Sequence, residues 1–560
     1  MSSPIVLKST YPNIDVPLQD LPTFFFARLK ASAPAPLIPL FVDSDTATLT
    51  LTAAELELLS TRLASGLYHT VGVRSGDIVA VVLPNSIYYL AVIMAVLMLG
   101  ATCTLANPAY TAGELAHQLS DSSARFVIVS RPGLAIILDA IERAGLTEIT
   151  ENQILCVQDK VVGEEECPEV RSIFDILCDR HFPLVHLTGD KRSLQRVPAL
   201  ICYSSGTTGL PKGVLLSHYN LVSNILQVGG VLATMTTPLT QRCALIVLPI
   251  FHSFGLVVSL SLPLIQTKLV IMRGFDLQRF FALVEQHRVT NTMLVPPILN
   301  QMVKMRHTAS AYDLSSLKWV ISGAAPLGTE TARCLELAYN GLAVMQGYGL
   351  TESSPGLSLG GPLAHRKGSS GQILPNIEAK VINDSGQSLE AGETGELCFR
   401  GPNIMIGYLN NDKATRETID QDGFLHTGDI GHVDADRFVY VTDRKKELIK
   451  FNGFQVAPAE LESILIQHPQ VRDCAVVGVF DQQRQTEVPR AYLVLAPLED
   501  TVTSTNLDET AQAIVTWMDC QVAYYKQLRG GYKIVSAIPK SASGKILRRA
   551  LHDTSVVFQK

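Results

Sequence analysis

A stretch rich in glycine and hydroxyl side chains constrains this chain more than any other. Residues 204–213 read SSGTTGLPKG and directly follow the apolar run 199–203. A strand that ends in such a loop presents backbone N–H groups, hydroxyls and an ammonium to a bound phosphate, with little side-chain bulk in the way. The Walker form is excluded, because Pro211 stands where it needs a glycine and no Ser or Thr follows Lys212. An ordinary surface loop is the alternative to a phosphate-binding loop. The predicted phosphate contacts are Ser204, Ser205, Gly206, Thr207, Thr208, Gly209 and Lys212.

Short apolar runs alternate with helical patterns on both sides of this loop. Residues 77–83, 125–129 and 148–157 are predicted strands, and residues 53–68 a predicted helix. Strands that are apolar on both faces and separated by helices are typical of parallel α/β layers. After about residue 368 the segments shorten and gain turns, which indicates a β-rich part. Further strands are expected at 243–249 and 318–323, and further helices near 218–228 and 278–287.

Composition limits the class of partner. With 560 residues, of which 47% are hydrophobic and 18% charged, the chain can bury large cores and is expected to form at least two domains. A formal charge of −6 leaves no basic footprint for nucleic acid, so small molecules are the expected partners. The ten cysteines show no metal-ligand spacing, which suits a reducing compartment.

Residues 87–106 carry no formal charge and meet the length criterion for a membrane span. Gly100 and Thr102 interrupt this stretch and Pro108 ends it, so we expect a buried helix at 86–99 and then a short buried strand. The first residues lack the pattern of a secretory signal, and the final FQK differs from a peroxisomal address. A cytoplasmic protein without a transmembrane segment is therefore expected.

Several later stretches combine small residues with side chains that suit a nucleotide. Residues 322–326 read SGAAP, residues 346–352 read QGYGLTE and residues 422–431 read DGFLHTGDIG. Each of these could be only a turn. A charged segment at 442–452 has the composition of an interdomain linker, and residues 539–549, PKSASGKILRR, place a lysine on a Gly/Ser loop.

Together and in this order, the stretches resemble the signature of the adenylate-forming enzymes, which include acyl-CoA synthetases, 4-coumarate–CoA ligases and firefly luciferase. The resemblance covers nearly the whole chain. It implies an α/β and α+β fold: a large N-terminal domain of layered α/β subdomains plus a β-rich subdomain, and a small mobile α+β C-terminal domain. The implied boundary lies near Lys446, so residues 1–445 would bind ATP and the acid, and residues 446–560 would carry the adenylation lysine.

The resemblance implies roles on the nucleotide side. Tyr348 would lie against adenine, next to Ala325, and Asp429 would accept both ribose hydroxyls. Thr351 would contact the α-phosphate, and Glu352 would supply a hard oxygen to Mg²⁺. The other implied contacts of the adenylate are Gln346, Gly347, Arg444, Lys450 and Gln455.

Lys545 matches the family's adenylation lysine. A carboxylate that attacks the α-phosphate brings two anions together, so a bridging cation is needed for approach and for the transition state. Gly453 would approach the pantetheine arm of coenzyme A. Asn452 stands where many relatives have lysine, which puts one polar contribution to thioester formation in doubt.

Residues 249–255, PIFHSFG, resemble the substrate-side segment, with His252 as the gating residue. Amino-acid-activating relatives carry an aspartate there, so an acid without an α-amino group is expected. Small residues leave room for a flat ring, which favours a cinnamate-type or other aryl acid, with a medium-chain fatty acid second. The implied acid-binding residues are His252, Phe254, Gly323, Ala324, Gly347 and Pro355, and the implied catalytic ones are Lys545, His252, Thr351 and Glu352.

The implied activity is that of an ATP-dependent acyl-CoA ligase, which forms acyl-AMP and transfers the acyl group to coenzyme A with ATP and Mg²⁺. Loading of a carrier protein and luciferase-like oxidation are the alternatives. A non-enzymatic nucleotide sensor is disfavoured because Lys212, Glu352 and Lys545 are all present. Monomer and homodimer both remain open.

Overall fold

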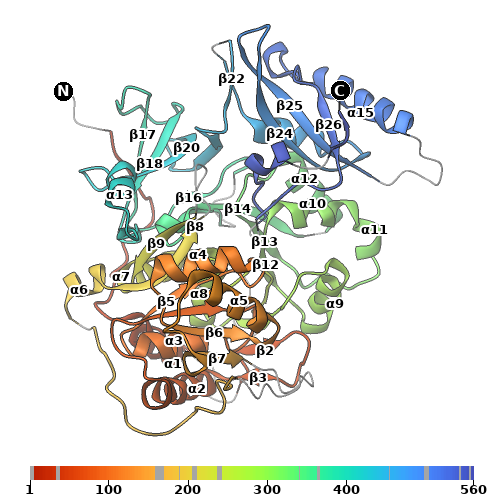
Figure 1. Cartoon of the computed structure of the whole chain (residues 1–560). Coiled ribbons are helices and arrows are strands. Elements are labelled where there is room, and N and C mark those ends of the chain that lie inside the picture. The colour runs from red at the N-terminus through yellow and green to blue at the C-terminus, as the bar shows by residue number, and fades with distance from the viewer. Residues whose placement is uncertain are drawn as a thin grey trace.

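The computed structural model describes residues 5–32, 38–157, 170–187, 189–204, 211–235, 242–339, 341–361, 366–452, 454–496, 504–541, 544–553 and 556–559. Figure 1 shows a large body with a smaller one, drawn in blue, above it. The main apolar core of the large body runs from Leu7 to Val439, whereas a separate core from Ile449 to Ile534 belongs to the small one. These bodies are called the large and the small domain below.

The first sheet of the large domain contains the strands around the phosphate loop. β8 (Pro198–Ser204) ends where the loop begins, and β9 (Lys212–Ser217) follows the loop and pairs antiparallel with β8. The loop therefore connects a hairpin, and β9 is a strand that the sequence pattern did not predict. The order is β19-β9-β8-β5-β4-β6-β7, with β4 (Ile78–Val82), β5 (Thr102–Leu105), β6 (Phe126–Ser130), β7 (Ile154–Val157) and β19 (Gly407–Tyr408).

Strand β4 is buried on both faces, as its continuous apolar sequence predicts. Val79 and Val81 belong to the main core, whereas Ala80 and Val82 belong to another core that includes side chains of α4 (Ala112–Ser122) and α5 (Leu134–Ala144). The pairing from β8 through β5, β4 and β6 to β7 is parallel. The predicted parallel α/β layer is thus confirmed.

A nine-stranded sheet forms the second layer, in the order β16-β15-β14-β13-β12-β10-β11-β2-β3. Helix α7 (His218–Ala233) contacts β9 of the first sheet and β15 of the second, and α8 (Ser253–Leu264) packs against α7, so these helices lie between the sheets. The strands are β2 (Phe41–Asp43), β3 (Thr50–Leu51), β10 (Cys243–Ile246), β11 (Lys268–Ile271), β12 (Asn291–Leu294), β13 (Trp319–Ser322), β14 (Ala343–Gly349), β15 (Gly356–Leu359) and β16 (Gln372–Ile373).

The region after residue 368 is β-rich, as predicted. It contributes β17, β18, β20 and β21 to an antiparallel five-stranded sheet in the order β1-β17-β18-β20-β21. The strands of this sheet are β1 (Leu7–Lys8), β17 (Glu378–Ile382), β18 (Gly395–Arg400), β20 (Leu425–Val433) and β21 (Val439–Arg444). The small domain contains a β-hairpin and a four-stranded sheet with two helices. Its elements are β22 (Ile449–Phe451), β23 (Phe454–Val456), α14 (Pro458–Leu465), β24 (Val471–Asp481), β25 (Thr486–Leu495), α15 (Ser504–Asp519), β26 (Tyr532–Val535) and β27 (Val556–Gln559).

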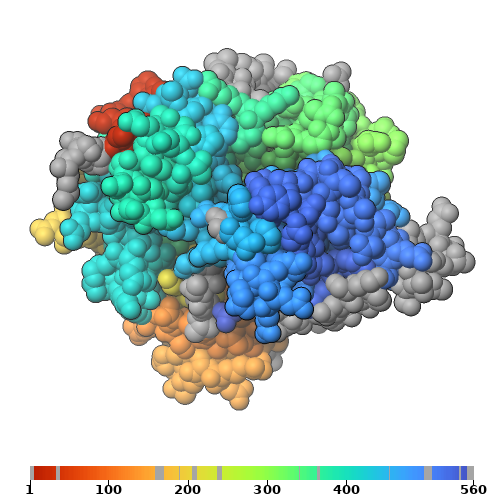
Figure 2. Space-filling model, turned by 90° about the horizontal axis from the view of Figure 1, so that it is seen from above, coloured from red at the N-terminus to blue at the C-terminus, as the bar shows by residue number. Residues whose placement is uncertain are grey.

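Figure 2, seen from above, shows the small domain resting against the large one, next to the green and cyan segments. The segments below it in Figure 1 include α10 and α12. The other helices of the large domain are α1 (Leu21–Ser32), α2 (Ala53–Gly66), α3 (Tyr89–Met98), α6 (Lys191–Arg196), α9 (Leu277–His287), α10 (Pro296–Lys304), α11 (Arg306–Ala309), α12 (Thr329–Ala338) and α13 (Asp412–Thr418).

Some boundaries predicted from the sequence were wrong. The strand expected at 148–157 is confined to β7, because a capping box between Thr150 and Gln153 closes a helical turn before it. The helix expected at 53–68 is α-helical only to Gly66, where α2 ends, and a π-helical turn, Leu67–Val71, follows directly. The apolar stretch 87–106 forms buried α3 and β5, as predicted. None of the described helices has the length and apolar character needed to cross a bilayer.

Candidate active site

A cavity of about 480 Å³ gathers most of the predicted site residues. A neighbouring cavity of about 200 Å³ shares part of its wall and adds Ala325, Gln346 and Asp429. Ser205, Gly206, Thr207, Thr208, Gly209 and Gly453 lie outside the described residues. The predicted residues that line the larger cavity are Ser204, Lys212, His252, Phe254, Gly323, Ala324, Gly347, Tyr348, Thr351, Glu352, Pro355, Arg444 and Lys545.

Tyr348 and Asp429 form the nucleotide side of the site. Tyr348 lies near the end of β14, and Asp429 lies on β20 in register with Arg444 of β21. The Tyr348 hydroxyl donates to Asp429 Oδ2 at 2.6 Å, and Arg444 Nε lies 3.4 Å from Oδ1. Burial raises the pKa of the Asp429 carboxyl, and the charge of Arg444 opposes that shift. The Asp429 carboxylate therefore lies between the Tyr348 phenol and the Arg444 guanidinium.

The phosphate side is built around Glu352. Its Oε1 accepts hydrogen bonds from the Tyr408 hydroxyl at 2.9 Å and from Ser204 Oγ at 3.2 Å. Lys212 Nζ lies 4.8 Å from the centroid of the Tyr408 ring. Sequence reasoning missed Tyr408, because only the pairing of β19 with β9 places it next to the phosphate loop. A carboxylate, hydroxyls and an ammonium thus converge where that loop begins and ends.

Lys545 extends from the small domain into the larger cavity. The residue lies between Lys540 and Ile546, which pair as an isolated β-bridge, and its N–H donates to Ser541 Oγ at 3.1 Å. Burial lowers the pKa of the Lys545 ammonium to about 8, and the positive charge of Arg444 acts in the same direction. The group is mainly charged at neutral pH, but it loses its proton far more easily than an ordinary lysine.

The far end of the cavity is apolar. Phe254 on α8 covers Gly323 so closely that a methyl group built on Gly323 would lie 2.6 Å from the ring. A larger residue there would force the Phe254 ring to shift. We call these two residues and the following apolar walls the apolar end: Val228, Leu232, Val257, Val258, Met293, Ile321, Leu359 and Leu374. Sequence reasoning missed the walls because they read as ordinary core positions of helices and strands.

His252 also lines this cavity and is the N-cap residue of α8. Its Nδ1 accepts the Phe254 N–H at 3.5 Å, a weak contact. Burial lowers the pKa of His252 to about 4. The imidazole is therefore neutral at pH 7 and adds no positive charge next to the apolar end.

Gln346 has a structural contact in addition to its predicted role. Its Oε1 accepts the Leu327 N–H at 3.0 Å and its Nε2 lies 3.4 Å from Leu327 O. These bonds join β14 to the segment that follows Ala324 and Ala325. Ala324 has a φ of +70°, in the left-handed region that non-glycine residues seldom occupy. Ala324 and Ala325 precede the segment to which Gln346 is bonded.

Two predicted contacts do not reach the site. Lys450 and Gln455 are exposed on the β22–β23 hairpin and line neither cavity. Asn452, at the turn of this hairpin, has a φ of +45°. Asparagine tolerates this left-handed conformation better than lysine, and an Asn–Gly pair is typical of tight hairpins. The departure at position 452 thus has a local backbone explanation.

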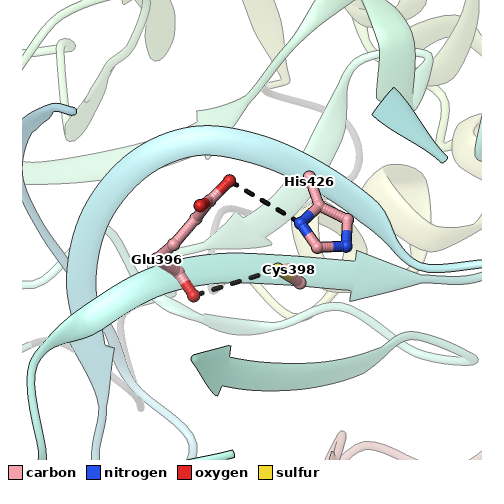
Figure 3. Close-up of side chains that lie close together, drawn as sticks. All are labelled: Glu396, Cys398 and His426. Atoms are coloured by element: carbon pink, nitrogen blue, oxygen red, sulfur yellow. Dashed lines mark hydrogen bonds and ion pairs between the residues drawn. The ribbon is translucent and has the colours of Figure 1, made fainter. Parts of the chain in front are cut away.

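Glu396 and Cys398 of β18 and His426 of β20 lie together beside the cavity (Figure 3). Their potential ligand atoms lie within 4.8 Å of one another, which alone would suit a metal ion. Burial raises the pKa of the Cys398 thiol to about 12, however, and the ammonium of Lys445 already lies 3.2 Å from Glu396 Oε2. A protonated thiol is a poor metal ligand. Within the cluster, Glu396 is the residue that pairs with Lys445, whose ammonium also lies 3.2 Å from Asp384 Oδ1.

Comparisons with known proteins identify the family. The family model described as AMP-binding enzyme matches residues 33–409, and the AMP-binding enzyme C-terminal domain matches residues 460–545. A probable 4-coumarate–CoA ligase 3 of Dictyostelium discoideum is 36% identical over 558 residues, which cover 97% of each chain. The 4-coumarate–CoA ligase 1 of Narcissus pseudonarcissus is 38% identical over 563 residues, 98% of this chain and 96% of the relative.

Solved structures have the same fold. ATP-bound MatB from Rhodopseudomonas palustris superposes with a TM-score of 0.75 at 26% identity, over 94% of this chain and 98% of its own. An anthranilate–CoA ligase with bound anthranoyl-AMP gives a TM-score of 0.80 over 96% and 98% of the two chains, but at 24% identity it supports the fold alone. The chain belongs to the AMP-binding, adenylate-forming enzymes. Within this family it is an AMP-forming acid–CoA ligase similar to the 4-coumarate–CoA ligases, and its substrates are a carboxylic acid, ATP and coenzyme A.

The predicted family and fold class are thereby confirmed. The structure brings most of the predicted site residues together. The role of each residue stays a prediction and is taken up below.

Proposed function

We propose that this ligase activates a carboxylic acid without an α-amino group and with a flat apolar acyl part, of the cinnamate or another aryl type. A medium-chain fatty acid is the second choice. The apolar end carries this proposal: its described walls are aliphatic or aromatic, with no carboxylate to pair with an ammonium. Ser358 also lines the cavity, but its hydroxyl already donates to Ser370 O at 2.9 Å. A largely apolar acyl group fits this surface best.

Lys545 would act in the adenylation step. Its ammonium, near Arg444, lies in the same cavity as the phosphate side and the apolar end. There it would bridge an oxygen of the attacking carboxylate and an oxygen of the α-phosphate, and so offset their mutual repulsion. Thr351, which is buried at the same cavity, would donate to the α-phosphate.

Glu352 would hold Mg²⁺. The carboxylate and the Ser204 hydroxyl beside it are hard oxygen ligands that suit this cation. Bound Mg²⁺ would offset negative charge on the phosphates, and Lys212 would contribute a second positive charge. On the nucleotide side, Asp429 would accept the ribose hydroxyls and the Tyr348 ring would lie against adenine.

The small domain would begin at Lys446 and change orientation between the two steps. Lys545 lines the cavity, whereas Lys450 and Gln455 of the same domain are exposed away from it. A rotation about residues 445–446 would exchange these two faces of the small domain. Such a rotation is a hinge motion that a few residues absorb. Lys445 and Lys446 are exposed, and the rotation would break the ion pairs of Lys445 with Glu396 and Asp384.

The test is to incubate the protein with ATP, Mg²⁺, coenzyme A and a panel of acids: cinnamic, 4-coumaric, benzoic, hexanoic and octanoic acids and phenylalanine. Mass spectrometry then detects acyl-CoA, acyl-AMP and AMP. Cinnamic-type acids should give the highest kcat/KM, and phenylalanine should give no product. Preferred turnover of phenylalanine would refute the assignment of the acid class, and acyl-AMP without a thioester would indicate a carrier protein as the acceptor.

Lys545→Ala is the matched variant for the mechanism. It should abolish acyl-AMP formation but leave thioester formation from supplied acyl-AMP largely intact. Equal loss of both steps would show that Lys545 acts on the structure of the protein instead of on adenylation.

A further inference from the structure

Helix α10 of the large domain touches the small domain at both of its ends. At its start, a methyl group built on Gly544 would lie 3.1 Å from Val295 Cγ2 and 3.4 Å from Pro297 Cγ. Gly544 immediately precedes Lys545. The beginning of α10 is thus in close contact with the backbone that carries the proposed adenylation lysine.

At its end, α10 carries Lys304, whose ammonium reaches the small domain. Nζ donates to Val471 O at 2.5 Å and to Arg472 O at 3.0 Å. The register between β24 and β25 shifts between Val471 and Asp473, so Arg472 lies in a β-bulge. A bulge leaves its extra residue outside the regular ladder, which makes a carbonyl available to a donor from elsewhere.

The bulge is linked to the loop that carries Lys545. Asp473 directly follows the bulge, and its two carboxylate oxygens accept from Lys540 Nζ at 2.8 and 2.6 Å. Lys540 in turn forms the β-bridge with Ile546, on the other side of Lys545. Lys304 is therefore connected to the base of this loop through Asp473, its ion pair with Lys540, and the bridge between Lys540 and Ile546.

We propose that Lys304 is a positioning residue for adenylation: by binding the two carbonyl groups of the bulge, it favours the domain orientation in which Lys545 enters the cavity. The inference rests on the adenylation role proposed above for Lys545. Lys304 lines neither cavity, so it acts through the small domain and not on a substrate. The bond to Val471 O is part-buried and the bond to Arg472 O is exposed, so water replaces only part of the contact. Its loss should slow adenylation moderately, roughly tenfold.

Lys304→Met removes the ammonium and keeps most of the aliphatic stem. Acyl-AMP formation, measured as pyrophosphate release without coenzyme A, should fall roughly tenfold. Thioester formation from supplied acyl-AMP should keep its rate, because that step needs the other domain orientation. The probes are cinnamic acid and cinnamoyl-AMP, or octanoic acid and octanoyl-AMP if the panel selects aliphatic acids. Lys304→Arg, which retains a donor, should restore most of the lost rate.

Lys318→Met is the matched control. Lys318 is also an exposed lysine, and its Nζ donates to Ser315 O at 2.8 Å, entirely within the large domain. This variant should change neither step. Asp473→Asn, which weakens the ion pair with Lys540, should reproduce the selective loss of adenylation and provides a second test if Lys304→Met folds poorly.

Equal loss of both steps in Lys304→Met would overturn the inference, and so would unchanged rates in both. Lys545→Ala, measured in parallel, separates this inference from the proposed function. If Lys545→Ala still forms acyl-AMP, the adenylation role itself is wrong. If Lys545→Ala is inactive in adenylation and Lys304→Met is not slowed, only the positioning role is wrong.

Discussion

Raising the pH should switch off acyl-AMP formation near pH 8. Burial and Arg444 lower the pKa of Lys545 from 10.5 to about 8, and the bridging role needs the protonated ammonium. With this pKa, about nine tenths of the groups are charged at pH 7 but only about one tenth at pH 9. In the free enzyme the adenylation rate should therefore fall roughly tenfold per pH unit above pH 8. An ordinary lysine would show no such fall below about pH 10.

The assay is pyrophosphate release in the absence of coenzyme A, so that titration of the coenzyme A thiol does not affect the measured rate. The pH dependence of kcat/KM for ATP reports the free enzyme, so its midpoint should lie near pH 8. Bound ATP and acid add negative charge next to the ammonium, which favours its charged form. The pH dependence of kcat should therefore have its midpoint at a higher pH than that of kcat/KM.

A flat kcat/KM profile from about pH 7 to about pH 9.5 would refute this reasoning, since Lys545 would then not titrate or not act as a cation. Lys545→Arg is the control, because a guanidinium keeps its charge over this range. Its residual activity should be low and independent of pH. A fall near pH 8 that persists in Lys545→Arg would assign the titration to another group.

Three substitutions test other parts of the site. Asp429→Ala should raise the KM for ATP roughly 10- to 100-fold, because the ribose loses a charged acceptor, and the KM for the acid should change little. Gly323→Ala should push the Phe254 ring into the apolar end and lower kcat/KM for aryl acids roughly tenfold, as expected for overpacking. Tyr408→Phe should raise the Mg²⁺ concentration that gives half-maximal activity by roughly severalfold, because Glu352 loses a hydrogen bond that orients it.

Each substitution has an outcome that contradicts the assignment. An unchanged KM for ATP in Asp429→Ala would remove the ribose contact. Equal kinetics for large and small acids in Gly323→Ala would place the acid elsewhere. A Mg²⁺ dependence that Tyr408→Phe leaves unchanged would separate Glu352 from the metal.

Local motifs located much of the site in the sequence, because these residues must sit on loops and turns with a distinctive composition. Tyr348, Asp429 and Lys545 were all found in short stretches rich in glycine and small polar residues. The same reasoning missed Tyr408, which reaches Glu352 only because β19 pairs with β9. It also placed Lys450 and Gln455 at the adenylate, whereas in this domain orientation both are exposed elsewhere.

The sequence by itself determined the alternating strand and helix pattern, the β-rich region and the motifs, because hydrophobic period and turn composition act over a few neighbouring residues. Only the tertiary structure decided which apolar side chains form the acid-facing surface. Val228 of α7 and Met293 of β12 look like any core residues in the sequence, and they meet at one cavity only when helix and sheet pack together. The contact between the two domains at Lys304 and Val471 likewise appears only in the tertiary structure, since no local pattern specifies a partner so distant in the chain.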